Sequence, residues 1–220
     1  MKINYILTIL ALVLFACNGV RVVKPLDKGQ KQIGASFGGP MIKMGNAPVV
    51  MPLTSVHGAY GITKKTTGFA SVHTTSLLFG VVHTDMGFTT LVSENNKYKP
   101  GITVSGIANA MIDHWEWRFS LLPQFDANCF WHYKQKPNLV YISLQNWFEP
   151  RSKRVHGEQQ HVRWLPSIGI GHQWVKQKYN YQLECKMIGF NQNNQNLVVK
   201  YISPASNGAL GLYFGIQRKF

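Results

Sequence analysis

Acidic residues and long apolar runs are both scarce in this 220-residue chain. Only 9 residues are Asp or Glu, and charged residues make up 15% of the total, where an average soluble domain has about 25%. Hydrophobic residues nevertheless reach 45%, which excludes a disordered chain. No apolar run approaches the roughly 18 residues that a membrane-spanning helix needs. Any membrane span must therefore use another architecture.

Cysteine is sparse too, and no nucleotide-binding motif is present. The three cysteines are Cys17, Cys129 and Cys185. They form no C-x-x-C pair and have no histidine at zinc spacing, so we expect neither a metal site nor a disulfide framework. The glycine-rich stretch 36–40 opens no helix and lacks the lysine of a phosphate-binding loop. The sequence therefore predicts no cofactor.

The amino terminus has the layout of a secretory signal. A lysine at the start of the chain is followed by an apolar stretch at residues 6–15 and by the small residue Ala16. A positive start, an apolar stretch of this length and a small residue are typical of a cleaved signal peptide. We therefore expect the chain to be exported from the cytoplasm.

The last residues of this signal also resemble the lipobox of bacterial lipoproteins. The tetrapeptide is Leu14-Phe15-Ala16-Cys17. The resemblance implies a signal peptide at 1–16, a lipidated amino terminus and linker at 17–30 with the lipid on Cys17, and one domain at 31–220. Several acyl chains would hold the protein firmly to a membrane. Ordinary signal cleavage with Cys17 merely adjacent is the alternative.

The rest of the chain alternates in character with a period of two. In 207–220 the even positions are largely apolar and the odd positions are small or polar, and 181–187 and 119–131 show the same alternation. Such alternation indicates β-strands with two chemically different faces. We expect ten strands, at residues 31–38, 53–62, 68–76, 79–92, 101–108, 118–132, 138–148, 162–175, 179–190 and 207–220.

The connections between these strands alternate between short and long. The short ones are 63–67, 93–100, 133–137 and 176–178, and the long ones include 39–52, 109–117, 149–161 and 191–206, whereas 74–79 offers no clear turn. Short turns on one rim, long loops on the other and an even strand count resemble bacterial outer-membrane β-barrels. The predicted fold is therefore all-β, an antiparallel up-and-down β-barrel of about ten strands, with eight to twelve possible.

Aromatic residues recur where an apolar band would end. Trp164 and Trp174 share a strand and a face; ten residues at about 3.3 Å, tilted by about 40°, span roughly 25 Å, the height of such a band. Phe119 and Trp131 are similarly placed, and the terminal Phe220 resembles the aromatic signal that outer-membrane assembly machinery reads. We expect these five residues at the membrane interfaces. Aromatic side chains filling a soluble core are the alternative.

The basic excess, a net charge of +14, gathers in the predicted short turns. Eight lysines, here named the basic rim, lie there: Lys64, Lys65, Lys97, Lys99, Lys134, Lys136, Lys176 and Lys178. Lysines beside anionic head groups can each contribute about 1 kcal/mol. The expected partner is thus the lipid bilayer of the outer membrane, and nucleic acid is not expected. Lysines that are simply common in polar turns are the alternative.

Residues that could support catalysis are few. His73 and Thr75 would share a strand face, with Asp85 or Glu158 to orient the imidazole, an arrangement that could activate a hydroxyl for attack on an ester. Hydrogen bonding in a polar lumen explains the same residues without catalysis. We also expect the lumen to be filled by polar side chains, namely Gln32, Gln124, Asp126, Gln182, Glu184 and Lys186.

Three hypotheses about function follow. The first is a small outer-membrane barrel, lipid-anchored, with a structural, surface-interaction or narrow-transport role and no evident catalysis. The second is a soluble periplasmic lipoprotein whose barrel binds an apolar ligand inside. The third is a lipid-modifying barrel enzyme. Strand alternation alone does not separate the first two, because it does not tell which face meets water.

Overall fold

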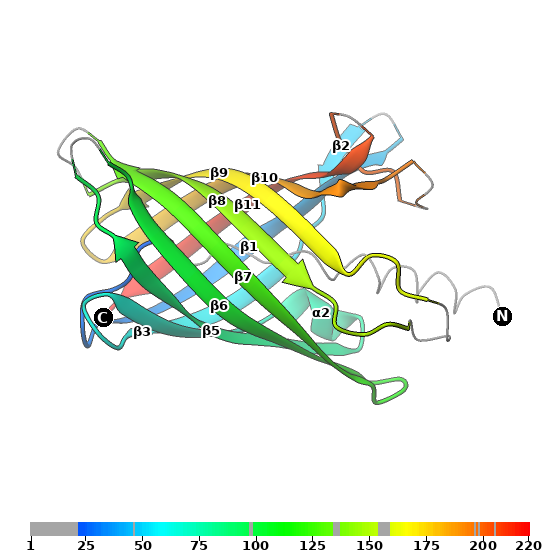
Figure 1. Ribbon diagram of the computed structural model, residues 1–220, viewed down its shortest axis with the longest axis horizontal. Coiled ribbons are helices and arrows are strands. Elements are labelled where there is room, and N and C mark those ends of the chain that lie inside the picture. Colours follow the sequence, from blue (N-terminus) through cyan, green and yellow to red (C-terminus); the bar gives the residue numbers. More distant parts are fainter. Residues whose placement is uncertain are drawn as a thin grey trace.

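The chain forms a closed antiparallel β-barrel (Figure 1). The computed structural model describes residues 22–45, 47–96, 99–133, 137–153, 159–195, 197, 199–204 and 206–220. The barrel strands are β1 (Lys31–Met44), β3 (Thr54–Gly61), β4 (Thr66–Val72), β5 (Val81–Ser93), β6 (Gly101–Asp113), β7 (Phe119–His132), β8 (Leu139–Phe148), β9 (Trp164–Val175), β10 (Tyr179–Asn193) and β11 (Asn207–Lys219). The predicted ten-stranded up-and-down barrel is confirmed.

Each strand pairs with its neighbours in sequence, and β11 closes the ring by pairing with β1. The register of this closing pair runs from Gln32 opposite Lys219 to Pro40 opposite Gly211. β2 (Ala47–Val50) pairs only with the end of β1 and extends beyond the barrel. Within the described residues, no helix is long and apolar enough to cross a membrane.

Two rims result from this topology. The short-turn rim carries the connections 62–65, 94–100, 133–138 and 176–178 and the carboxyl terminus, and the long-loop rim lies opposite (Figure 1). Side chains close the short turns: the Thr63 hydroxyl accepts hydrogen bonds from the backbone of Lys65 and Thr66, and Asn96 accepts one from Lys99. Such side-chain acceptors stabilise tight turns.

The wall of the barrel separates apolar side chains outside from polar side chains inside. On β11, the outward residues Leu212, Phe214 and Ile216 are 37–43% exposed, whereas Tyr213 and Gln217 point inward and are 1% exposed. All six polar side chains predicted to fill the lumen are buried, at 0–6% exposure. The alternation in the sequence thus reads as apolar side chains outside and polar side chains inside.

A hydrogen-bonded network fills the middle of the lumen. Glu184 accepts hydrogen bonds from Ser143 Oγ at 2.7 Å and Tyr141 OH at 3.1 Å. Its carboxylate lies 3.6 Å from Lys186 Nζ, which also donates to Gln145 Oε1 at 3.2 Å. Tyr141 lies against Gly171 on the neighbouring strand, where a Cβ would come within 2.2 Å of the phenol ring. Glycine is therefore required there by the close approach of the ring.

The strand boundaries differ from the sequence prediction at the long-loop rim. The predicted strand 68–76 is wrong at its end, because β4 stops at Val72 and residues Thr74–Leu78 form the short helix α2. Thr54 holds this segment, since its backbone N–H and hydroxyl both bond to Thr75 Oγ1 at 2.8 Å. The predicted loops 39–52 and 109–117 are also largely strand, because β1 forms a hairpin with β2 and β6 extends to Asp113.

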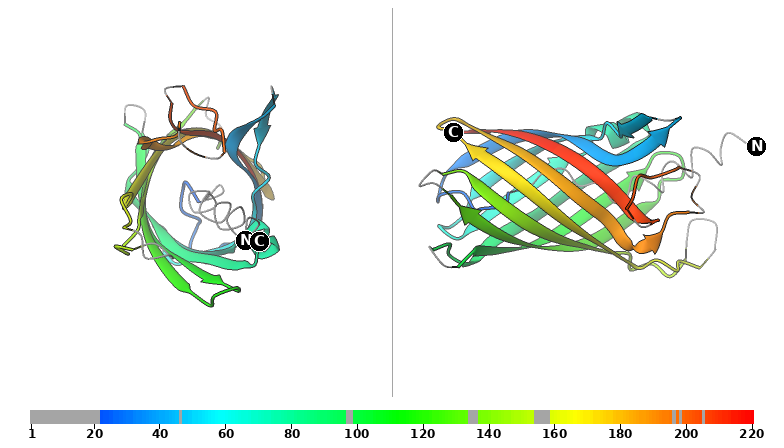
Figure 2. Two further views of the ribbon diagram at one scale, coloured as in Figure 1. Left: turned by 90° about the vertical axis from the view of Figure 1, so that its right-hand side faces the viewer. Right: turned by 90° about the horizontal axis from the view of Figure 1, so that it is seen from above.

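The segment before β1 lies inside the barrel rather than beside it. Residues 22–30 enter the lumen from the short-turn rim (Figure 2). Leu26 N donates to Thr67 Oγ1 at 2.7 Å, and Thr103 Oγ1 donates to the Val23 carbonyl at 2.9 Å. Val22 and Leu26 pack with buried Ala59, Phe69 and Ile107, and Val23 packs with buried Phe130, Leu139 and Tyr141. This part of the predicted linker therefore seals one end of the lumen.

The pairing of buried charges in the lumen can be tested by substitution. Lys186→Met leaves the buried carboxylate of Glu184 without its cation, so we expect a loss of about 3–5 kcal/mol in the free energy of unfolding. The double variant Glu184→Gln/Lys186→Met should recover a large part of this loss. The measurement is the urea concentration at which the folded, faster-migrating gel band disappears. Lys178→Met on the exposed short-turn rim is the control, and a double variant as unstable as Lys186→Met would contradict the pairing.

Candidate functional site

The largest candidate site is the outer surface of the barrel. Every barrel strand contributes large apolar side chains that are at least 37% exposed, among them Phe37, Tyr60, Val72, Phe88, Val104, Phe125, Ile142, Ile170, Leu183 and Phe214. Soluble monomers rarely expose contiguous apolar patches larger than a few hundred Å². We call this ring of outward apolar side chains the apolar belt.

The predicted interface aromatics lie on this outer surface. Trp164 and Trp174 are 47% and 37% exposed at the two ends of β9, Phe119 is 60% exposed, Phe220 is 61% exposed, and Trp131 is half-buried. Trp164 Nε1 donates to Asn146 Oδ1 at 3.1 Å. An apolar ring with a polar edge that makes a hydrogen bond suits a membrane interface.

Polar partners also accompany the aromatics at the short-turn rim. Trp174 contacts the His172 ring at 4.2 Å between ring centroids, and His172 Nε2 forms a 2.6 Å hydrogen bond with the Tyr133 hydroxyl. The Arg218 guanidinium lies 4.9 Å from the centre of the Phe220 ring. Polar and aromatic groups therefore lie together at this end of the belt.

Five lysines of the basic rim are described, and all five are exposed in short turns: Lys64, Lys65, Lys99, Lys176 and Lys178. Lys97, Lys134 and Lys136 lie outside the described residues, as do the signal peptide, the lipobox and Cys17. Lys28 and Lys31 are exposed beside the start of β1 at the same rim. These seven exposed lysines give the short-turn rim a positive charge.

The candidate catalytic residues are only partly brought together. His73 Nε2 lies 2.7 Å from Asp85 Oδ2, and both side chains are buried. Thr75 is directed elsewhere, because its hydroxyl bonds to Thr54 and to the Pro52 carbonyl. The hydroxyl that joins the pair is Ser71, which donates to Asp85 Oδ1 at 2.9 Å. Glu158 lies outside the described residues.

The order of these groups does not match that of an activated nucleophile. In a catalytic triad the imidazole lies between the hydroxyl and the carboxylate, where it can take the hydroxyl proton. Here the carboxylate of Asp85 lies between Ser71 and His73. The His73 ring is also stacked on His83 at 3.8 Å between centroids. The described residues contain no group of three or more His, Cys, Asp or Glu side chains able to hold a metal ion.

A small cavity lies in the lumen between the polar network around Glu184 and the segment 22–30. A cavity of about 10 Å³ is lined by Val22, Val23, Ser105, Asp126, Asn128, Tyr141, Gln145, Gln182 and Glu184. Such a volume holds about one water molecule. It is too small for an organic ligand, whose sites typically measure about 300–1,000 Å³.

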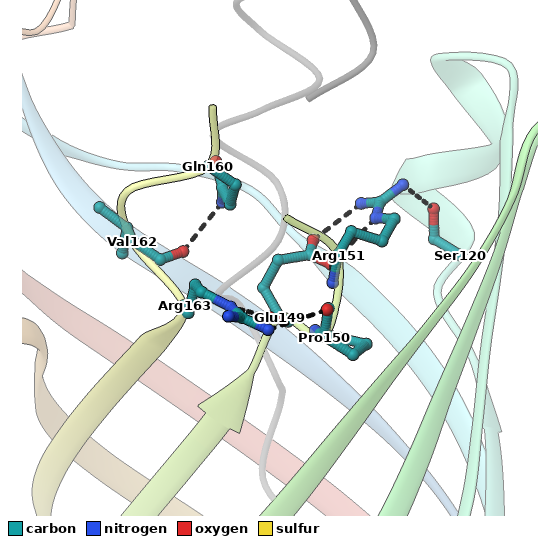
Figure 3. A network of polar contacts seen from close by, with 7 residues as sticks. All are labelled: Ser120, Glu149, Pro150, Arg151, Gln160, Val162 and Arg163. Carbon is teal, nitrogen blue, oxygen red and sulfur yellow. Dashed lines mark hydrogen bonds and ion pairs between the residues drawn. The ribbon is translucent and has the colours of Figure 1, made fainter. Parts of the chain in front are cut away.

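A polar network organises the long-loop connection between β8 and β9 (Figure 3). Arg151 forms a two-pronged contact with Glu149, with Nε–Oε1 at 2.9 Å and Nη2–Oε2 at 2.8 Å, and Nη1 donates to Ser120 Oγ at 2.7 Å. Arg163 Nη2 donates to the Pro150 carbonyl at 3.0 Å. Burial acts to raise the pKa of Glu149, but hydrogen bonds and charge from Arg151 outweigh it and hold that pKa below its ordinary value.

The sequence prediction missed two features of the structure. One is the lumen segment 22–30, whose only signal is a few apolar residues before β1. The other is the exposed pair Trp115 and Trp117 at the tip of the β6–β7 hairpin. That pair lay within a predicted loop, so it was not counted among the interface aromatics.

The buried contact between His73 and Asp85 yields a direct test of the enzyme hypothesis. Asp85→Asn and His73→Ala should each lower the free energy of unfolding by about 1–3 kcal/mol, because each leaves a buried polar group without its partner. Mass spectra of lipid A from cells producing the wild type and each variant should be identical. A mass difference that depends on His73 would contradict a purely structural role for His73 and Asp85 and would support lipid modification.

The Glu149–Arg151 contact predicts a pH-dependent loop. Because the pKa of Glu149 is lowered in the folded protein, its contribution is present above the ordinary carboxyl pKa and is lost as pH falls through the lowered value. Hydrogen exchange at the Arg151 and Gln160 amides should therefore be slow at neutral pH and become faster in Glu149→Gln. Glu116→Gln, which disrupts an exposed ion pair with Arg118, should leave both amides unchanged.

Comparison with known proteins yields structural similarity only. No protein-family model matches the chain, and no curated protein matches its sequence. An outer membrane channel from Pseudomonas putida F1 is similar over 93% of this chain and 100% of that chain, with 10% identity and a TM-score of 0.50. The translocator domain of the autotransporter NalP from Neisseria meningitidis covers 100% of this chain and 95% of that one, with 9% identity and a TM-score of 0.44. At such low identity the likeness shows the barrel fold alone.

Proposed function

We propose that this chain is an integral outer-membrane β-barrel with a sealed lumen, exported by its signal peptide and anchored in addition by a lipid on Cys17. Its role is structural or one of surface interaction: the barrel holds the long loops at one face of the membrane. The observation that carries the proposal is the apolar belt around all ten strands, enclosing a polar and filled interior.

The distribution of polarity favours a membrane over a water-soluble barrel. A soluble barrel with an apolar ligand needs apolar side chains inside and polar ones outside. Here the inward residues Gln124, Gln182 and Gln217 are 0–1% exposed. The outward face exposes side chains such as Ile170 and Phe125 at 64% and 58%. Alternation with the apolar side outward is the pattern of membrane barrels.

The sealed lumen favours a surface role over transport by diffusion. A ten-stranded ring has an interior that side chains can fill. Glu184, Lys186 and their partners occupy its middle, and the segment 22–30 occupies the short-turn end. A continuous aqueous path is not needed for a protein whose loops act at the surface.

The basic rim supports one orientation in the membrane. Short turns face the periplasm in bacterial barrels of this kind. The exposed lysines of the short-turn rim would then lie beside phospholipid head groups, where each can contribute about 1 kcal/mol. Phe220 lies exposed at the same rim, where it would be available to assembly machinery during insertion.

The lipid anchor can be separated from the barrel as a source of membrane attachment. Cys17→Ala removes the proposed lipid site and leaves β1–β11 intact. We expect the variant to stay in washed outer membranes and to migrate faster on a denaturing gel before boiling than after it. Release into the soluble fraction would contradict the integral barrel. Loss of a palmitate label from the variant, but not from Cys129→Ala, would establish lipidation at Cys17.

The sealed lumen predicts an electrically silent barrel. Purified protein reconstituted in planar bilayers should show no stable conductance at neutral pH, because the network around Glu184 and the segment 22–30 block the path. Discrete, reproducible channels from the wild-type chain would contradict the sealed lumen. A known porin reconstituted in parallel controls for insertion.

A further inference from the structure

The tip of the β6–β7 hairpin and the helix α2 together expose a second apolar surface at the long-loop rim. Leu78, Trp117 and Trp115 are 84%, 74% and 73% exposed, the highest values among the exposed large hydrophobic residues of the described chain. Leu77, which precedes Leu78 in α2, is 46% exposed. We call these four residues the tip patch. An exposed cluster of this kind marks an interaction surface.

The tip patch is held in a defined shape. His114 N donates to the Gly80 carbonyl at 2.9 Å, which ties the hairpin to the end of α2. The indole of Trp115 lies against Gly80, where a Cβ would come within 2.7 Å of Nε1. The His114 ring contacts both indoles edge-on, at 5.8 Å and 5.6 Å between centroids. The two indoles are thus presented by a fixed scaffold.

Backbone strain at the tip of the hairpin indicates that the conformation of the tip patch serves a function. Trp117 has a φ of 53°, a left-handed conformation that is costly for a bulky residue. Such strain persists only where the surrounding structure imposes it, and it gathers at functional sites. The strained residue here is one that exposes an indole rather than burying it.

The tip patch continues the apolar belt on one side of the barrel. Val82, Ile112 and Phe119 lie on the outward faces of β5, β6 and β7 directly below it and are 46%, 37% and 60% exposed. The hairpin leans away from the barrel wall at the long-loop end (Figure 2). The hairpin that carries Trp115 and Trp117 therefore extends past the barrel wall at the long-loop rim (Figure 2).

Polar groups at the tip are paired within the hairpin. Arg118 Nε lies 2.8 Å from Glu116 Oε2, with both side chains about half exposed, and Asp113 Oδ1 accepts a hydrogen bond from Trp115 N at 2.8 Å. The surface thus offers apolar area and indole N–H edges beside a hydrated ion pair. Tryptophan prefers this mixture of apolar and polar surroundings at the boundary of a bilayer.

We propose that the tip patch is a lipid-binding anchor that inserts Trp115 and Trp117 into the outer leaflet beside the barrel. The partner is lipid at the level where acyl chains meet head groups. This inference rests on the proposed outer-membrane function, because it assumes that the apolar belt faces lipid. Lipid is favoured as the partner because the tip patch is continuous with the apolar belt through the adjacent outward residues Val82, Ile112 and Phe119.

Tryptophan quenching by brominated lipids tests the proposal. Three chains each keep one of the six tryptophans and carry phenylalanine at the other five positions. The retained residues are Trp117 in the tip patch, Trp164 in the apolar belt and Trp147, which is 5% exposed inside the barrel. Each is folded into phosphatidylcholine vesicles with bromine near the head group or deep in the acyl chains, and the gel shift on boiling verifies folding.

The anchor predicts that shallow bromine quenches Trp117 at least twofold more than it quenches Trp147. Trp164 quenched while Trp117 is not would overturn the anchor and leave the membrane barrel standing. If neither residue is quenched in a folded barrel, the proposed membrane function itself fails. Trp117 emission that shifts to the blue only as the protein-to-lipid ratio rises would mean that a second copy covers the patch, which also overturns the lipid anchor.

Discussion

Pairing of β1 with β11 is the interaction on which the rest of the structure depends. These strands come from the two ends of the barrel domain and meet in an unbroken register from Gln32–Lys219 to Pro40–Gly211. Without this pair, two strand edges would carry unpaired backbone groups, which a bilayer cannot hydrate. Closure also separates the two faces of every strand. The filled lumen and the apolar belt are therefore two consequences of one ring.

Closure with ten strands creates an interior in which the buried polar side chains must form hydrogen bonds and ion pairs with one another. Glu184 is stabilised by Ser143, Tyr141 and Lys186 because no solvent layer is available to it. Toward the short-turn rim the chemistry changes, and Val22, Val23 and Leu26 pack against inward apolar residues. A polar network and an apolar seal thus block the lumen in series. Between these two layers the described lumen keeps a cavity of about 10 Å³.

The sequence predicted the strands of the barrel wall better than the segments at the two ends of the barrel. On β7, β10 and β11 the alternation is clear, because each face meets a different medium, and it identified lumen residues such as Gln124 and Glu184 correctly. Residues Thr74–Leu78 form too short a helix to produce a recognisable period. The segment 22–30 has no period, and its burial depends on threonines from distant strands. Of the candidate catalytic residues, His73 and Asp85 lie within hydrogen-bond distance, whereas Thr75 turns away within the helix.

The two rims differ in the force that would hold them at a membrane. At the short-turn rim the exposed lysines act by charge, which salt screens over about 10 Å at 0.1 M ionic strength. At the long-loop rim Leu78, Trp115 and Trp117 act by apolar area, which salt does not screen. If the apolar belt faces lipid, these two surfaces distinguish one orientation of the barrel from the other. Charged groups at the long-loop rim are held in ion pairs such as Glu149–Arg151 and Glu116–Arg118. The lysines of the short-turn rim lie instead in exposed turns.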